Sequence, residues 1–395
     1  MKRWLTLLYL LLCLCGFMTV KISAQGTVII DSFYSESLTE FRNYTVYLPE
    51  GYDEQSVETY PVIYFLHGFG ADHTDYEGMY SDLDQLISSG EIQKLIVVKP
   101  DGSCTPYEGS FYTNSILNGN FEDYIVYDLV DYIDVRYRTK PFAEFRAISG
   151  HSMGGYGTMK LAMKHCDIFT SLSAHSAPLD FQNFDNEFFP QLVLWENSGG
   201  EFDPENGHVT NLMFAMSAAF SPNLENPPFY VDLPIDPQGE IIDSTFQRWL
   251  EHDPYTMIDN YIPALENLHI YFDCGLWDEL LLYSHSVDFS ARLTDLDIDH
   301  IFKTFMGDHT TQIYTRLKDS FPFHSDHFEH VKPCSYGDVN RDGEVNVLDA
   351  LRAVNIILEV GDPASEYELW ASDVNEDEAV NVLDVVMIVN MILEG

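Results

Sequence analysis

A serine flanked by two glycines lies where a strand pattern in the sequence gives way to a helix pattern. Residues 150–154 read Gly-His-Ser-Met-Gly and fit the pattern G-x-S-x-G. The residues just before, 146–149, are typical of a short strand, and residues 159–163 are typical of a helix. A sharp turn from strand to helix exposes a serine hydroxyl at its tip, and the glycines prevent collisions where strand and helix meet. We therefore predict that Ser152 is a nucleophile.

Strand and helix patterns alternate around this turn. The apolar runs that predict buried strands are residues 60–66, 94–99, 171–175, 268–273 and 301–306, after an opening antiparallel strand at 43–48. Helical spacing is found at residues 75–89, 124–137 and 311–319. This alternation predicts a mostly parallel sheet with right-handed crossovers. Together with the serine turn, it predicts an α/β-hydrolase fold.

A nucleophilic serine needs a base and an acid that orients the base, and in this fold they follow the serine in the order acid, then histidine. The acid belongs in the loop after the strand at 268–273. We favour Asp278 there, with Asp273 and Glu279 as alternatives. The histidine belongs after the last strand, where we favour His309 as the base. The later candidates His324, His327 and His330 lie beyond the next predicted helix. Such a triad requires no cofactor for catalysis.

Acyl transfer also needs N–H groups that stabilise the oxyanion. The fold predicts one from the residue after the nucleophile, Met153, and one from the loop after the strand at 60–66, at Phe69. His151, beside the nucleophile, is interpreted as a residue that lines the pocket or packs in the core.

Residues 178–247 interrupt the alternation of strand and helix patterns. They are rich in Phe, Asn, Pro and Gly and have no strict period, although residues 212–219 could form a helix. A long insertion at this point often forms a lid or a wall of the pocket. The alternative is a surface excursion with no role.

These motifs resemble the esterase D-like family of α/β-hydrolases. The resemblance is carried by the segments 66–68, 111–115, 150–157, 275–278 and 307–309. It covers about residues 29–177 and 248–320, and it implies Ser152, Asp278 and His309 as the triad. The family includes feruloyl esterases and acetyl xylan esterases. The insertion is longer than the family pattern leads us to expect.

The C-terminal region repeats a calcium-loop pattern with an offset of 35 residues. Oxygen side chains occupy loop positions 1, 3, 5, 9 and 12, and position 7 offers a backbone carbonyl. Position 12 is Asp, where an EF-hand has Glu. The predicted ligands are Asp338, Asn340, Asp342, Glu344, Asn346 and Asp349 in the first loop, and Asp373, Asn375, Asp377, Ala379, Asn381 and Asp384 in the second.

Two such loop–helix units resemble a type I dockerin, a small all-α domain. The resemblance implies two structural Ca²⁺ ions and a cohesin partner on a scaffold or cell-surface protein. The recognition pairs would be residues 347–348 and 382–383, unless these apolar residues pack in the core. Glu378 replaces glycine at position 6 of the second loop, which predicts weaker binding there.

The ends of the chain predict a secreted protein that a cohesin could hold at the cell surface. Residues 1–24 have a basic start, an apolar run and a small residue before position 25, which is typical of a secretory signal peptide. The alternatives are an uncleaved membrane anchor and a lipoprotein signal at Cys15. The formal net charge of −43 argues against nucleic acid and anionic membranes as partners. We therefore divide the chain into a signal peptide (1–24), an esterase domain (25–325), a linker (326–336) and a dockerin (337–395).

The sequence thus predicts a secreted serine esterase that removes feruloyl or acetyl groups from plant cell-wall polysaccharide such as xylan. The polysaccharide is inferred from the dockerin by association. Two alternatives stay open, an acyltransferase that uses the same triad and a non-catalytic carbohydrate-binding module.

Overall fold

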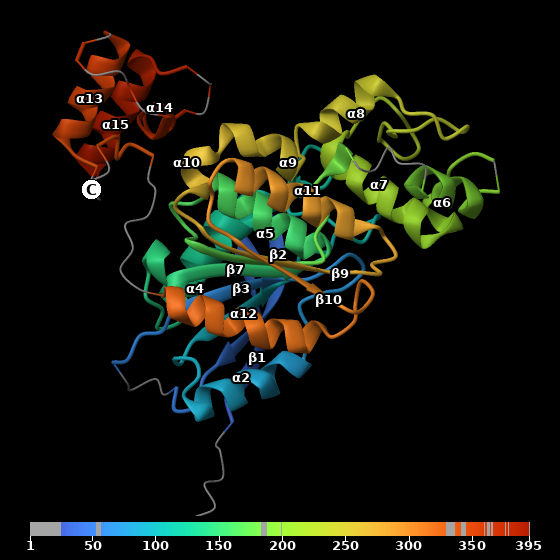
Figure 1. Cartoon of the computed structure of the whole chain (residues 1–395), viewed down its shortest axis with the longest axis horizontal. Helices are drawn as coiled ribbons and strands as arrows, with labels where there is room; N and C mark the ends of the chain where they lie inside the picture. Colours follow the sequence, from blue (N-terminus) through green and yellow to red (C-terminus); the bar gives the residue numbers. More distant parts are fainter. Residues whose placement is uncertain are drawn as a thin grey trace, which may run out of the picture.

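The computed structural model describes residues 25–52, 57–182, 188–198, 200–328, 336–340, 345–358, 360–361, 364, 366–375, 377 and 379–394. The predicted signal peptide lies outside these residues. Figure 1 shows a central sheet with helices on both faces and a separate group of C-terminal helices.

In the described residues the central sheet has eight strands, in the order β1-β2-β4-β3-β7-β8-β9-β10. The first two strands pair antiparallel, β2 pairs antiparallel with β4, and the other neighbours are parallel. The strands are Thr27–Ser35 (β1), Glu40–Leu48 (β2), Val62–Leu66 (β3), Ile96–Pro100 (β4), Arg146–His151 (β7), Ser171–His175 (β8), His269–Gly275 (β9) and Ile301–Phe305 (β10). A small hairpin joins Asn114–Ser115 (β5) to Gly119–Asn120 (β6).

The strand β3 shows why the central runs are continuously apolar. Ile63 and Phe65 pack in the core below the sheet, with α2 (Gly78–Ser89) and α12 (Ile313–His327). Val62, Tyr64 and Leu66 point to the opposite face of the sheet and pack in the larger core, which includes α5 (Met153–Lys164). Both faces are covered, so every residue of the strand is buried. The predicted mostly parallel sheet is confirmed.

Two of the predicted helices differ from those observed. The run at 124–137 divides into a π-helical segment, η1 (Tyr124–Leu129), and α4 (Val130–Arg136), preceded by α3 (Phe121–Asp123). Helix α12 passes the predicted end at residue 319 and crosses the expected domain boundary at 325. It continues because His324 is buried, with Nδ1 2.7 Å from Oγ of Ser171 and Nε2 2.9 Å from Oγ of Ser173.

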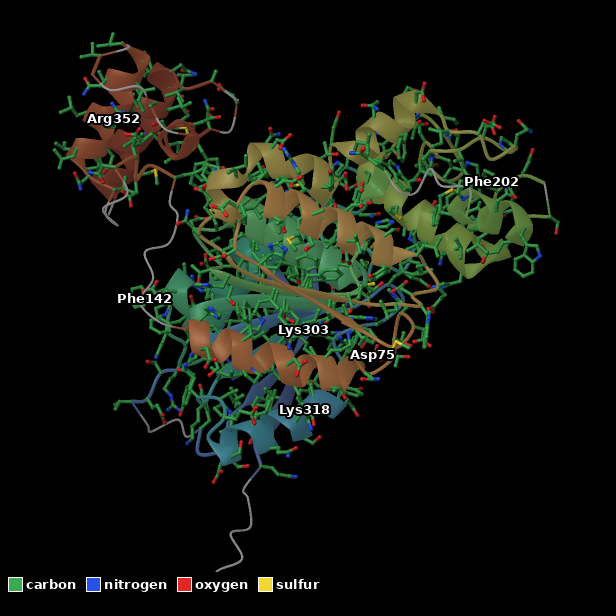
Figure 2. All side chains as sticks on the ribbon, in the orientation of Figure 1. Asp75, Phe142, Phe202, Lys303, Lys318 and Arg352 are labelled. Carbon is green, nitrogen blue, oxygen red and sulfur yellow. The ribbon has the colours of Figure 1, made fainter. Side chains whose placement is uncertain are left out.

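The insertion packs onto the body of the molecule. Its elements are α6 (Phe188–Glu196), η4 (Pro204–Asn206), α7 (His208–Phe220) and α8 (Asp243–Leu250). The rings of Phe181 and Phe220 lie 5.6 Å from that of Tyr156 in α5, and Trp249 packs against both phenylalanines. This aromatic cluster anchors the insertion, while Phe202 marks its outer part (Figure 2). The chain returns to the sheet through α9 (Pro254–Met257), η5 (Ile258–Asn260) and α10 (Ile262–Leu265).

The remaining elements complete the two units. The short η2 (Ala143–Phe145) precedes β7, and α11 (Leu282–Asp295) joins β9 to β10. The C-terminal unit contains α13 (Val347–Ile357), α14 (Glu366–Ser372) and α15 (Val382–Glu394) around a small core of Val339, Ala350, Ala353 and Ile388. Arg352, labelled in Figure 2, bonds the carboxylate of Glu368 and so ties α13 to α14. Helix α14 packs on α10, where Ala371 joins the core of the larger unit.

Candidate active site

The turn between β7 and α5 holds Ser152 in a conformation that few side chains adopt. Its φ of 57° and ψ of −118° lie outside the regions open to most residues. A Cβ on Gly150 would lie 2.3 Å from the carbonyl oxygen of Gly154, and one on Gly154 would lie 2.0 Å from that of Leu66. Only glycine fits at these two positions, and this close approach lets the turn present Ser152 at the carboxyl edge of the sheet.

Ser152, His309 and Asp278 form one chain of hydrogen bonds. The Oγ of Ser152 lies 2.8 Å from Nε2 of His309, and Nδ1 of this ring lies 2.8 Å from Oδ2 of Asp278. Asp278 follows β9 and His309 follows β10, so neighbouring parallel strands bring both to the edge where β7 ends. Because Nδ1–H donates to the carboxylate, Nε2 is free to accept the hydroxyl proton. This geometry suits a nucleophile, a base and an orienting acid.

The carboxylate of Asp278 is buried and is held by its own loop. The N–H of Leu280 donates to Oδ1 at 3.0 Å, and the thiol of Cys274 lies 3.6 Å from Oδ2. Glu279, one of the alternative acids, instead accepts the backbone N–H of His309 at 3.0 Å. Two successive acids therefore bind different parts of the same histidine, Asp278 the ring and Glu279 the backbone.

The other alternative acid, Asp273, belongs to a buried ion pair. Its Oδ1 accepts hydrogen bonds from Nε and Nη2 of Arg316 at 2.9 and 2.6 Å, and its Oδ2 lies 2.7 Å from Nδ1 of His175. Burial would raise the pKa of Asp273, but the charges and hydrogen bonds of His175 and Arg316 outweigh it and lower that pKa. Both oxygens of Asp273 are thus engaged away from the ring of His309.

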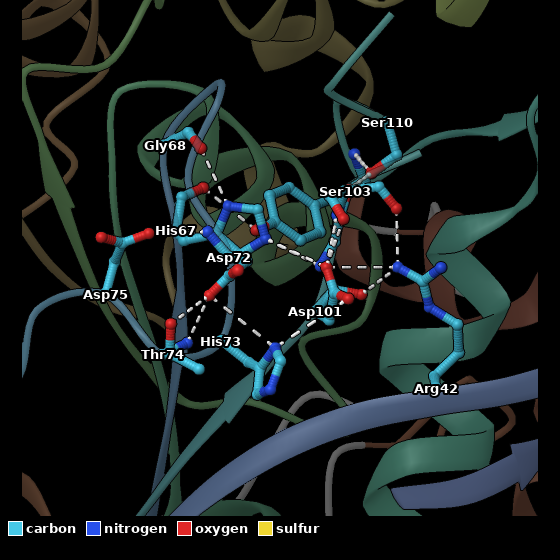
Figure 3. A network of polar contacts seen from close by, with 12 residues as sticks. Arg42, His67, Gly68, Asp72, His73, Thr74, Asp75, Asp101, Ser103 and Ser110 are labelled. Carbon is cyan, nitrogen blue, oxygen red and sulfur yellow. Dashed lines mark hydrogen bonds and ion pairs between the residues drawn. The ribbon is translucent and has the colours of Figure 1, made fainter. Parts of the chain in front are cut away.

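The segment after β3 is fixed by side-chain hydrogen bonds (Figure 3). Nδ1 of His67 donates to the carbonyl of Gly68 at 2.8 Å, and Nε2 accepts the N–H of Gly102 at 2.8 Å. The hydroxyl of Tyr112 donates to the carbonyl of His67 at 3.0 Å. Burial lowers the pKa of His67, which keeps the ring neutral and suits these donor and acceptor roles. Phe69 follows directly after this fixed pair.

Phe69 and Met153, the predicted oxyanion residues, lie close together. A Cβ on Gly109 would come within 2.7 Å of both the sulfur of Met153 and the ring of Phe69, so the two side chains converge on this glycine. Met153 is also the first residue of α5, where backbone N–H groups have no partner within the helix.

A polar pocket with a volume of about 570 Å³ lies beside this segment and begins at Gly70, one residue after Phe69. Its wall also includes Glu108 and Asn118, together with Arg42. Arg42 is fixed by the carbonyl of Ser103 at 2.6 Å and by Asp101 (Figure 3). Within the described residues, the carboxamide nitrogen and oxygen of Asn118 are both buried without a hydrogen-bond partner.

The insertion meets the same region. The ring of His208, at the start of α7, lies 5.3 Å from that of Phe69, and Asn211 donates to Glu108 at 3.3 Å. The hydroxyl of Tyr107 donates to the carbonyl of Phe229 at 2.8 Å. The insertion thus packs against the segment after β3 and against the pocket wall at Glu108.

The two C-terminal loops share one construction. In the first, the buried carboxylate of Asp349 accepts the N–H groups of Asn340 at 2.9 Å and Asn346 at 2.8 Å. In the second, Asp384 accepts those of Asn375 at 3.3 Å and Asn381 at 2.8 Å. The residue at position 12 therefore draws positions 3 and 9 toward it in both loops.

The donor atoms of these loops suit Ca²⁺, which prefers carboxylate and amide oxygens. Asp338 and the second-loop residues Asp373, Asp377 and Ala379 are described, whereas Asp342 and Glu344 lie outside the described residues. Among the residues that the structure describes, no three His, Cys, Asp or Glu side chains lie close enough together to hold a metal ion.

The apolar pairs at the starts of α13 and α15 face solvent. Val347 and Leu348 are 69% and 56% exposed, and Val382 and Leu383 are 66% and 62% exposed. The alternative that these residues pack in the core of the small unit is therefore wrong.

A family model described as "Putative esterase" matches residues 35–310, more than two thirds of the chain. The chain belongs to this family. A second model, "Dockerin type I domain", matches residues 336–393 of this esterase. These matches confirm the predicted family, the predicted dockerin and the predicted class of carboxylic ester hydrolase.

Curated relatives share part of this esterase. Esterase Rv1288 of Mycobacterium tuberculosis H37Rv is 31% identical over 152 residues, which are 38% of this chain and 32% of that protein. The endo-1,4-beta-xylanase/feruloyl esterase of Xylanibacter ruminicola is 32% identical over 154 residues, 37% of this chain and 21% of that protein. The chain spans a third or less of the length of these relatives.

Solved structures confirm the fold of the esterase. A ferulic acid esterase has a TM-score of 0.55 and 22% identity, covering 77% of this chain and 99% of that one. The serine hydrolase FphF of Staphylococcus aureus has a TM-score of 0.54 and 22% identity, covering 76% and 99%. No helix in the described part of the esterase combines the length and the apolar character needed to cross a bilayer.

Proposed function

We propose that this esterase is a secreted serine hydrolase that removes feruloyl or acetyl groups from xylan or a similar plant cell-wall polysaccharide. The observation that carries the proposal is the chain of two 2.8 Å contacts that links Ser152, His309 and Asp278. In the proposed division of the chain, a signal peptide (1–24) precedes the catalytic domain, which begins at residue 25 and includes the whole of α12 (Ile313–His327).

The proposed reaction passes through an acyl-enzyme. His309 takes the proton of Ser152 as the Oγ attacks the ester carbonyl, and Asp278 stabilises the imidazolium. The N–H groups of Phe69 and Met153 stabilise the oxyanion. His309 then returns the proton to the departing sugar hydroxyl, and a water molecule, activated by the same histidine, releases the acid.

Two observations support a sugar ester as the substrate. The relative from Xylanibacter ruminicola bears the name endo-1,4-beta-xylanase/feruloyl esterase. The pocket beside Phe69 is rich in polar groups, and a sugar hydroxyl can both donate to the carboxamide of Asn118 and accept from it. The wall of the pocket includes Gly70, the residue that follows Phe69, one of the two proposed oxyanion residues.

We propose that the dockerin (337–395) binds two structural Ca²⁺ ions and a cohesin on a scaffold or cell-surface protein. The exposed pairs at 347–348 and 382–383 support this role, because an apolar pair repeated on two helices offers a surface that a partner can bury. The cohesin would hold the catalytic domain close to its polymeric substrate.

The test is hydrolysis of methyl ferulate, acetylated xylan and p-nitrophenyl acetate by the mature protein. We expect Ser152→Ala to lose about 10³-fold or more in kcat. Ser81→Ala, on the exposed surface of α2, is the matched control and should keep full activity. Equal activity of Ser152→Ala and the control would refute the proposed nucleophile. Transfer of the acyl group to an added alcohol in preference to water would favour the acyltransferase, and sugar binding without any turnover would favour the binding module.

A further inference from the structure

A chain of three hydrogen bonds joins the segment after β3 to the loop of His309. The N–H of Gly68 donates to the hydroxyl of Tyr76 at 3.3 Å, and this hydroxyl lies 3.0 Å from Nδ1 of His151. At the other side of the ring, Nε2 of His151 lies 3.0 Å from the carbonyl oxygen of His309. The chain therefore runs from one residue before Phe69 to the proposed base.

The direction of each bond follows from the groups at the two ends. The carbonyl of His309 can only accept, so Nε2 of His151 carries the proton and Nδ1 of the neutral ring accepts. Tyr76 must then donate to Nδ1, which leaves its oxygen to accept from Gly68. Burial of His151, with His309 and Arg316 nearby, lowers its pKa well below the usual value, in agreement with a neutral ring.

The contact with His309 acts on its backbone and leaves the reactive ring free. The rings of His151 and His309 lie 5.0 Å apart and are tilted by 43°. Arg316 reaches the same carbonyl, but at 3.4 Å, so His151 makes the shorter contact. The backbone of His309 is thus held on its carbonyl by His151 and on its N–H by Glu279.

We propose that His151 is a positioning residue for His309, and that Tyr76 couples it to the segment that carries Phe69. A fixed backbone sets where Nε2 of His309 lies relative to Ser152, and an error of about 1 Å there costs about 10²-fold in rate. This inference rests on the proposed function of the triad. The alternative is that His151 only fills space beneath the site.

The test compares two substitutions that each keep one end of the imidazole. His151→Gln can place an N–H near the position of Nε2 and keep the bond to His309, whereas His151→Asn places its carboxamide near the position of Nδ1 and loses that bond. We expect kcat for p-nitrophenyl acetate to fall about 10- to 100-fold in His151→Asn and less than about fivefold in His151→Gln. In both variants KM should change by less than about threefold, because the side chain of His151 is buried.

A spectroscopic readout separates positioning from packing. The proton between Nδ1 of His309 and Asp278 gives a downfield NMR signal that depends on the geometry of that bond. We expect it to shift or broaden in His151→Asn and to stay near the wild-type position in His151→Gln. Tyr76→Phe, which removes only the hydroxyl, should lower kcat by about three- to tenfold.

Equal losses of kcat in the two His151 variants, with an unmoved NMR signal and a lower Tm in both, would overturn the proposal in favour of packing. An unchanged kcat in His151→Asn would overturn it as well. Failure of the proposed function would look different, since wild type would then hydrolyse no ester. In that case the NMR comparison alone still decides whether His151 positions His309.

Discussion

Arg316 donates two hydrogen bonds to a single carboxylate oxygen of Asp273, from Nε at 2.9 Å and from Nη2 at 2.6 Å. Both side chains are almost completely buried, and the arginine also reaches the carbonyl of His309. Asp278 binds the ring of that histidine instead. The two acids, which the sequence leaves as alternatives, therefore have separable roles.

Substitution of each acid by its amide should separate catalysis from stability. Asp278→Asn should lower kcat by about 10³- to 10⁴-fold with little change in Tm, because the amide cannot stabilise the imidazolium. Asp273→Asn should lower the free energy of unfolding by about 3–5 kcal/mol, because Arg316 loses its buried counter-charge. Ester hydrolysis and urea unfolding measure the two effects. A normal kcat in Asp278→Asn, or an unchanged stability in Asp273→Asn, would contradict these roles.

The buried carboxylate of Glu122 should make stability depend on pH. Burial would raise its pKa, but Lys160, Lys164 and His165 outweigh this effect and lower it well below the usual value. Because the folded pKa is depressed, the contribution is complete above the unfolded pKa of about 4.3 and is lost as the pH falls below it. Glu122→Gln should therefore be less stable than wild type at pH 7, and the difference should narrow below about pH 4.

Thermal unfolding of both proteins across this pH range is the measurement. Glu225→Gln, at an exposed position, is the control and should differ little from wild type at any pH. A difference between Glu122→Gln and wild type that stays constant down to pH 3 would rule out the ion-pair explanation.

The pocket beside Phe69 should distinguish sugar esters from simple esters. Asn118→Ala removes the carboxamide that has no partner among the described residues, so we expect KM for a feruloylated or acetylated xylo-oligosaccharide to rise about three- to tenfold. The KM for p-nitrophenyl acetate, which carries no sugar, should stay the same. Steady-state kinetics on the two substrates test this directly, and a parallel change for both would argue against a sugar site.

Removal of Ca²⁺ should unfold the C-terminal unit and spare catalysis. With EDTA, we expect loss of the circular dichroism of α13 to α15, but unchanged hydrolysis of p-nitrophenyl acetate, because the triad lies in the other unit.

Calorimetry of the C-terminal unit should find two Ca²⁺ sites. Glu378→Gly should tighten the weaker one about tenfold, since glycine avoids a cost of about 1–2 kcal/mol for left-handed backbone. A single site, or an unchanged affinity in this variant, would contradict the proposed second loop.

The local signals of the sequence were sufficient for the sheet and for the serine turn. The central strands are continuous apolar runs because both faces of the sheet are covered, and Gly154 is required by its approach to Leu66. The order of the triad along the chain is a property of the fold, so Asp278 and His309 could be predicted from their positions after β9 and β10. These residues are indeed within hydrogen-bond distance of each other.

Contacts between distant segments could not be predicted in this way. Arg316 lies 43 residues from Asp273, and no spacing rule connects them. His324 extends α12 because it bonds to two serines of β8, about 150 residues earlier in the chain. His151 occupies a position of the G-x-S-x-G pattern where any residue is allowed. No sequence pattern therefore predicts its hydrogen bond to Tyr76. Cysteine spacing alone cannot assign disulfides either, and in the structure Cys166 is disulfide-bonded whereas Cys104 and Cys274 are free.

The insertion leaves the chain after β8 and returns to it before β9. One continuous segment therefore supplies a wall beside Phe69 and Glu108, while Ser152, Asp278 and His309 all come from the strand ends outside it. The shape of the wall and the chemistry of the triad are thus encoded in separate parts of the gene. Exchange of this segment between relatives would be a direct route to new substrate preference in evolution, with the catalytic geometry inherited unchanged.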